Sequence, residues 1–153
     1  MPKRFAPTPP IAQWPARALR WGLVAAWMAV IFMASADGSS GEHSGALVRA
    51  ALELVGVEAS PERLELIGLL FRKASHFTEY AILALLWAWA LPKGRWRFVL
   101  AWAAATAYAA SDELHQAFVP GRGPALFDVG IDAMGAATAL VLCWLWRRAR
   151  RLT

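Results

Sequence analysis

A long apolar run near the N-terminus constrains this chain most strongly. It covers residues 18–36 and contains one charged residue, Arg20, close to its start. A helix of that length can cross the hydrocarbon core of a bilayer, whereas the apolar core of a signal peptide is shorter. Although Ala34, Ser35 and Ala36 resemble a signal-peptidase cleavage site, we predict a retained transmembrane helix.

Three further apolar segments follow, at residues 74–91, from residue 98 to about 110, and at residues 125–146. The third is short, so its helix is expected to continue through the polar residues 111–116, because ~20 residues are needed to cross a bilayer. The breaker clusters at residues 92–95 and 120–124 separate the segments. Hydrophobic residues make up 58% of the chain, which also has nine tryptophans. The sequence thus predicts an all-α polytopic membrane protein with a bundle of four transmembrane helices.

The remaining segments are assigned by their composition. Residues 1–16 are proline-rich and are expected to form a flexible cytoplasmic tail, residues 17–147 the transmembrane domain, and residues 148–153 a basic cytoplasmic tail. Residues 37–45 are predicted to be a polar loop. Residues 46–56 carry Arg49 and Glu53 four positions apart, which favours a short interfacial helix in the first outer loop. Ser60 and Pro61 predict a helix that begins at Pro61 and runs through Arg72 into the second span.

The distribution of charge predicts the orientation. Three segments carry eleven basic residues and no acidic one: Lys3, Arg4, Arg17 and Arg20; Lys93, Arg95 and Arg97; and Arg147, Arg148, Arg150 and Arg151. Short loops rich in Lys and Arg remain in the cytoplasm. We therefore expect a multi-pass protein of the bacterial inner membrane with both termini in the cytoplasm. Nucleic-acid binding is not expected, because the basic residues flank apolar segments. The tryptophans, Trp102 among them, fit interfacial or lipid-facing positions.

Polar residues cluster at the predicted outer ends of three spans. The cluster comprises Lys73, His76, Glu79, Asp112, Glu113, His115, Gln116, Arg122, Asp128 and Asp132. Helical spacing places Lys73, His76, Glu79 and Tyr80 on one face, and Gly135 continues the Asp128 and Asp132 stripe, which allows close helix approach. Ionisable groups in a membrane segment need partners or a function.

Several uses of this cluster stay open. The charges could pair and hold the helices together, or they could bind a divalent metal, for which His76, Glu79, Asp112 and His115 are candidate ligands. Acid/base hydrolysis with His115 as the base is another alternative. In a recognition site, Lys73 and Arg122 would bind phosphate while carboxylates accept hydrogen bonds from sugar or peptide groups. Cys143 is the only cysteine, so no intrachain disulfide can form.

At these residues the sequence resembles the VanZ-like family of bacterial membrane proteins, related to a teicoplanin-resistance protein. The resemblance is carried by residues 72–80, 111–122 and 128–135 and extends over about residues 19–145. One departure is Asp132, where the family pattern favours asparagine. The resemblance implies a multi-helix membrane protein linked with the envelope or with the response to glycopeptides.

We therefore expect the polar cluster to bind, and in one version to modify, a membrane lipid or a lipid-linked envelope precursor. One alternative is a metal-assisted membrane hydrolase or transferase that acts on envelope lipid. Another is a structural or partner-binding membrane protein. The sequence predicts no oligomeric state and identifies no catalytic residue.

Overall fold

Every regular element that the structure describes is an α-helix. The computed structural model describes residues 14–36, 40–119 and 126–151. Its five helices are α1 (Trp14–Ala36), α2 (Ser40–Leu54), α3 (Pro61–Ala90), α4 (Arg97–Gln116) and α5 (Leu126–Ala149). The prediction of an all-α fold is confirmed.

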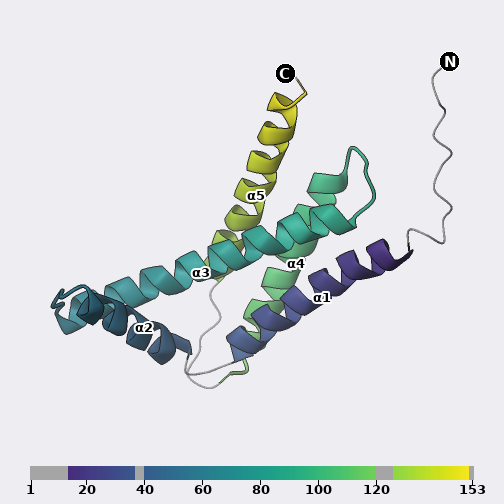
Figure 1. Ribbon diagram of the computed structural model, residues 1–153. Helices are drawn as coiled ribbons and strands as arrows, with labels where there is room; N and C mark the ends of the chain where they lie inside the picture. The colour runs from purple at the N-terminus through teal and green to yellow at the C-terminus, as the bar shows by residue number, and fades with distance from the viewer. Residues whose placement is uncertain (1–13, 37–39, 120–125, 152–153) are drawn as a thin grey trace, which may run out of the picture.

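Helix α3 is the element on which the others assemble. It packs against each of the other four helices. Figure 1 shows α2 folded back along the first half of α3, and α1 and α5 on opposite sides of its second half. The helix is continuous over 30 residues, which confirms the prediction that the segment beginning at Pro61 runs into the second apolar stretch.

Local chemistry determines where α2 ends and where α3 begins. Gly56 has a φ of 70°, and the N–H groups of Gly56 and Val57 bond to the carbonyls of Glu53 and Leu52, at 3.1 and 2.9 Å. This is a Schellman ending, in which glycine takes the left-handed position. Pro61 occupies the first turn of α3, where a missing N–H costs nothing. A hydrogen bond with the Ser60 side chain lowers the pKa of Glu62, and a backbone hydrogen bond adds to the effect.

Three helix boundaries differ from the predictions. Helix α2 begins at Ser40, so the loop predicted through residue 45 is wrong for residues 40–45. The reason is tertiary packing, because Gly45 lies against Gly68 of α3 and such contacts override weak local propensity. Helix α1 begins at Trp14, inside the predicted tail, because Pro15 is tolerated in a first turn. Helix α5 continues to Ala149 and takes in the start of the predicted basic tail.

Among the described residues, two helices are long and apolar enough to cross a membrane. These are residues Pro15–Ala36 of α1 and Leu126–Ala149 of α5. Helices α3 and α4 do not reach the same apolarity, since their sequences include charged and polar residues such as Lys73, Glu79 and Asp112. Length and composition therefore support two of the four predicted spans.

Small residues line the contacts between helices. The fully buried core includes Ala84, Ala101, Ala105, Ala109 and Ala136. At Gly135 of α5, an added Cβ would overlap the backbone carbonyl of Phe77 in α3. Small side chains let helix backbones approach closely, so the close approach predicted at Gly135 is confirmed.

Side chains also bond to the backbones of neighbouring helices. The Trp27 indole N–H in α1 donates to the Glu79 carbonyl of α3 at 3.0 Å, and the Tyr108 hydroxyl in α4 donates to the Met28 carbonyl of α1 at 2.6 Å. Trp102 donates to the Ala133 carbonyl of α5 at 3.1 Å. Trp102, which the sequence assigned to an interfacial or lipid-facing position, therefore also joins α4 to α5.

The contact at Gly135 generates a prediction about stability. Gly135→Ala should lower the free energy of unfolding by about 1 to 3 kcal/mol, because the new methyl group meets backbone that no rotamer change can move. The control is Gly130→Ala on the same helix, where a Cβ would meet nothing within 4 Å. That change should be neutral or slightly stabilising, because alanine favours a helix. Unfolding in detergent with increasing denaturant measures both, and equal effects at the two positions would contradict the packing.

Candidate functional site

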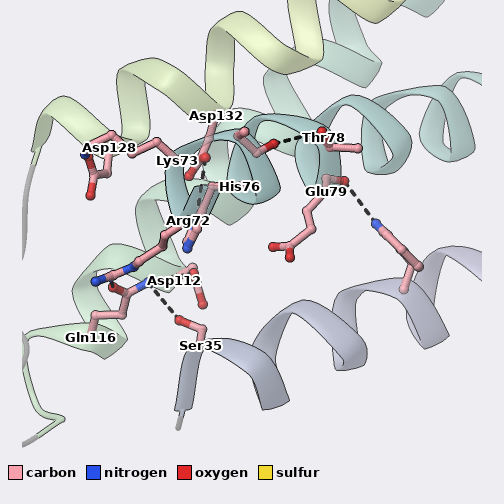
Figure 2. A network of polar contacts seen from close by, with 12 residues as sticks. Ser35, Arg72, Lys73, His76, Thr78, Glu79, Asp112, Gln116, Asp128 and Asp132 are labelled. Atoms are coloured by element: carbon pink, nitrogen blue, oxygen red, sulfur yellow. Dashed lines mark hydrogen bonds and ion pairs between the residues drawn. The ribbon is translucent and has the colours of Figure 1, made fainter. Parts of the chain in front are cut away.

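Most of the predicted polar residues gather at one end of the bundle, where α1 and α4 end and α5 begins. We call this group the polar centre. It consists of Ser35, Arg72, Lys73, His76, Glu79, Tyr80, Asp112, Glu113, Gln116, Asp128 and Asp132. Figure 2 shows that α3 contributes from the middle, with Asp132 on the α5 side and with Ser35, Asp112 and Gln116 on the side of α1 and α4.

Gln116 connects three helices within the polar centre. Its amide Nε2 donates to Ser35 Oγ of α1 at 2.8 Å and to Asp112 Oδ2 one turn earlier in α4 at 3.1 Å. Its Oε1 accepts a long hydrogen bond from Arg72 Nη2 of α3 at 3.5 Å. Gln116 is 1% exposed, so these bonds replace the water that the amide loses on burial.

His76 of α3 faces Asp132 of α5. Their closest atoms, Nδ1 and Oδ1, are 3.6 Å apart, which makes them an ion pair when His76 is protonated but leaves them beyond hydrogen-bond distance. Asp132 is 1% exposed. Within the described part of the chain, neither of its carboxylate oxygens accepts a hydrogen bond. A buried carboxylate without such partners costs free energy. A purely structural pairing with His76 therefore explains Asp132 poorly.

Lys73 and Asp128 form an ion pair between α3 and α5, with Nζ and Oδ1 2.5 Å apart. Both side chains are partly exposed. They line a small cavity of about 30 Å³ together with Arg72, His76 and Asp132. A space of this size holds about one water molecule. The cavity therefore lies between the His76–Asp132 pair and the more exposed Lys73–Asp128 pair.

Acidic groups exceed cations in the interior of the polar centre. Asp112 and Glu113 are buried, and the partly buried Glu79 interacts electrostatically with His76, Asp132 and Asp112. Asp112 Oδ1 and the Tyr80 hydroxyl are buried without a hydrogen-bond partner among the described residues. The interior therefore offers several oxygen atoms that can accept a hydrogen bond from another molecule.

The structure places the other sequence candidates as follows. His115, proposed as a base, lies on α4 against the Phe32 ring of α1, with ring centroids 4.7 Å apart. The histidine that does have a carboxylate beside it is His76. Arg122 lies outside the described residues. Nowhere in residues 14–36, 40–119 and 126–151 do three His, Cys, Asp or Glu side chains group so as to hold a metal ion.

Three members of the centre were not among the predicted site residues. Helical spacing places Tyr80 on the same face as Lys73, His76 and Glu79, but a tyrosine on such a face does not by itself indicate a site. Arg72 adjoins Lys73, and its spacing alone does not indicate a partner in α4. Ser35 is the only hydroxyl in the apolar run of residues 18–36, and an isolated hydroxyl at the end of an apolar helix is the signal that could have indicated it.

Residues 20–147 match the model of the VanZ/LLP1 family. The chain belongs to the VanZ/LLP1 family. No curated protein and no solved structure matches it. Membership of the VanZ/LLP1 family suggests a role in the cell envelope or in glycopeptide resistance. The match includes the apolar helices and the whole polar centre.

The hydrogen bonds of Gln116 generate a prediction about its structural role. Gln116→Leu keeps the size of the side chain but removes the bonds to Ser35 and Asp112, and it should lower the free energy of unfolding by about 1 to 2 kcal/mol. Ser111→Ala is the control, because the Ser111 hydroxyl bonds within its own helix, to the Tyr108 carbonyl, and is exposed. That control should change stability by less than about 0.5 kcal/mol. If Gln116→Leu were as stable as the parent chain, Gln116 would not join the helices.

Proposed function

We propose that the chain is a multi-pass inner-membrane protein with four spans: α1, the second half of α3, α4 and α5. Large apolar side chains are exposed on all four, including Phe32, Leu85, Val99 and Leu142. Only 17% and 22% of the apolar windows of α1 and α5 are buried within the protein, unlike the core helices of a soluble domain. Lipid would cover these surfaces.

The same proposal places both termini and the connection between α3 and α4 in the cytoplasm. The positive-inside rule supports this orientation, because those three segments together contain eleven basic residues and no acidic one. The polar centre then lies toward the outer face. The hairpin of α2 and the first half of α3 would lie at the outer interface, with apolar Leu54 and Leu70 exposed beside charged Arg49 and Glu53.

At the polar centre we propose binding of a cell-envelope component, a lipid-linked glycan precursor or a similar phospholipid. The observation that carries this proposal is the set of buried acceptor oxygens on Asp112 and Asp132 that no described residue satisfies. Such atoms suit hydroxyl, amide or amino groups of a ligand, because a ligand donor removes the cost of leaving them unpaired.

The cations of the centre would bind the phosphate of that ligand. Among the described residues, Arg72 makes one long hydrogen bond, to Gln116, and Lys73 stands at the cavity mouth, 30% exposed. Arginine and lysine bind phosphate oxygens through charge-assisted hydrogen bonds, and Arg122 is a further candidate in the segment before α5. Because the cavity is about 30 Å³, the headgroup would remain at the mouth and only a terminal donor group would replace the water inside.

Hydrolysis of the bound component is a second candidate function, favoured by the position of His76. His76 and Asp132 line the cavity that can hold one water molecule. An imidazole beside a carboxylate can accept a proton from such a water as the oxygen attacks an ester or phosphoester. Release of a product from the envelope lipid by purified protein would distinguish hydrolysis from binding alone.

The proposed orientation predicts the location of fused reporters. Alkaline phosphatase fused after Ala149 should be inactive, because the enzyme folds only outside the cytoplasm, whereas a green fluorescent protein at the same position should fluoresce. Phosphatase inserted at Glu58, between α2 and α3, should be active. The reverse pattern would contradict the positive-inside assignment.

The proposed binding site predicts a loss of function without a loss of folding. If the proposal is correct, expression of the parent chain should change teicoplanin susceptibility, and His76→Phe and Asp112→Asn should each abolish that change. His76→Phe removes the imidazole nitrogens, and Asp112→Asn removes the negative charge and one acceptor oxygen. Membrane-inserted protein should remain at the parental level on immunoblots. Gly130→Ala, at an exposed position of α5 where a Cβ would meet nothing within 4 Å, should behave as the parent chain. If the two site variants had the same susceptibility as the parent chain, the proposal would be refuted.

A further inference from the structure

The opposite end of the bundle contains a second, strongly basic cavity. It measures about 580 Å³ and lies between the α3–α4 connection and the last turns of α5. Its lining consists of Lys93, Gly94, Arg97, Phe98, Trp144, Arg147, Arg148 and Arg151. We call it the basic cavity.

The sequence segments around the basic cavity supply no acidic side chain. Residues 1–36, 80–111 and 133–153 contain no aspartate or glutamate. The cations instead face one another, since Arg97 interacts electrostatically with Arg147 and Arg20. Like charges held together raise the free energy of the site unless an anion joins them.

Arg97 shows that this cavity is built into the fold. It is only 9% exposed, and its Nε donates to the backbone carbonyl of Ala88 in α3. It is also the first residue of α4, whose first turn has no acidic residue. The positive end of the helix dipole therefore adds to the positive charge of the arginine, and both favour a bound anion.

An apolar groove leads away from the basic cavity along α4 and α5. This groove measures about 410 Å³ and is lined mainly by Val99, Trp102, Leu140 and Val141. Phe98 and Trp144 line both spaces, so the two lie next to each other. A group of cations at the end of an apolar groove matches the two parts of a phospholipid, an anionic headgroup and an acyl chain.

We propose that the basic cavity and its groove bind one anionic glycerophospholipid of the cytoplasmic leaflet. The phosphate lies among Arg97, Arg147 and Arg148, where guanidinium groups can bind it in bidentate geometry, and an acyl chain lies on Val99 and Val141. This site rests on the proposed membrane insertion of α4 and α5. It does not depend on the polar centre or its ligand.

Fluorescence quenching tests the proposal on the full-length chain. The protein is placed in nanodiscs of phosphatidylcholine that contain a small fraction of lipid with brominated acyl chains, which quench tryptophans in contact with them. Trp102 and Trp144 line the groove. Brominated phosphatidylglycerol should quench at about one-tenth of the mole fraction that brominated phosphatidylcholine requires. Added glycerol 1-phosphate, a headgroup without a chain, should not reverse the quenching.

Matched variants separate a specific site from general surface charge. The double variant Arg147→Gln and Arg148→Gln should lose the preference for phosphatidylglycerol. The mole fraction of this lipid needed for quenching should rise about tenfold or more. Both residues are exposed, so folding should be retained. The control, Arg17→Gln with Arg150→Gln, removes the same charge at the same end, but neither residue lines the cavity. It should keep the preference.

Three results would overturn the proposal. Equal quenching by the two brominated lipids would show that no anionic headgroup is selected. An equal effect of the two double variants would show attraction by net charge alone. Reversal of the quenching by glycerol 1-phosphate would show that the cavity binds a free phosphate compound. None of these results bears on ligand binding at the polar centre, which His76→Phe and Asp112→Asn test separately.

Discussion

The close contact between Gly135 of α5 and the backbone of Phe77 in α3 sets the geometry on which the rest of the structure depends. An added Cβ would overlap the Phe77 carbonyl, so only glycine allows the two helices to approach this closely. Asp132 lies about one helical turn before Gly135, and His76 immediately precedes Phe77. The same contact therefore brings the partly buried His76 and the buried Asp132 to within 3.6 Å of each other. A larger residue at 135 would separate them and would open the small cavity beside them.

Within the polar centre, some buried side chains have their hydrogen bonds satisfied and others do not. The amide group of Gln116 connects α1, α3 and α4. It stabilises the fold because its hydrogen bonds are made although the group is buried. Asp132 and one oxygen of Asp112 lack such partners in the described chain and cost stability. Packing elsewhere must hold them in place, and the alanine contacts and the bonds from Trp27 and Tyr108 do so. A cost of this kind is expected at a site that awaits a ligand.

The sequence predicted those features that depend on local chemistry. Pro61 marked the start of α3, and the length required of a span extended α4 to Gln116. The charges suggested that Lys73 or Arg122 pairs with Asp112 or Asp128, and the structure contains one of these pairs, Lys73 with Asp128. Features that depend on tertiary packing could not be predicted in this way. Residues 40–45 have weak helical propensity and are helical because α2 packs on α3, while His115 faces Phe32 because of the rotation of α4. The role of Ser35 likewise depends on a partner 81 positions away in the chain.

The two ends of the bundle differ in charge as well as in proposed ligand, and the central question is whether the buried carboxylate of Asp132, which accepts no hydrogen bond from a described residue, is structural or functional. The free energy of unfolding of Asp132→Asn in detergent, compared with the parent chain, tests this most directly. Asparagine keeps the size of the side chain and removes its charge. If the carboxylate is retained for a ligand, the variant should be at least as stable as the parent chain. A loss of more than about 1 kcal/mol would show that the His76–Asp132 pair holds the helices together and would contradict the account.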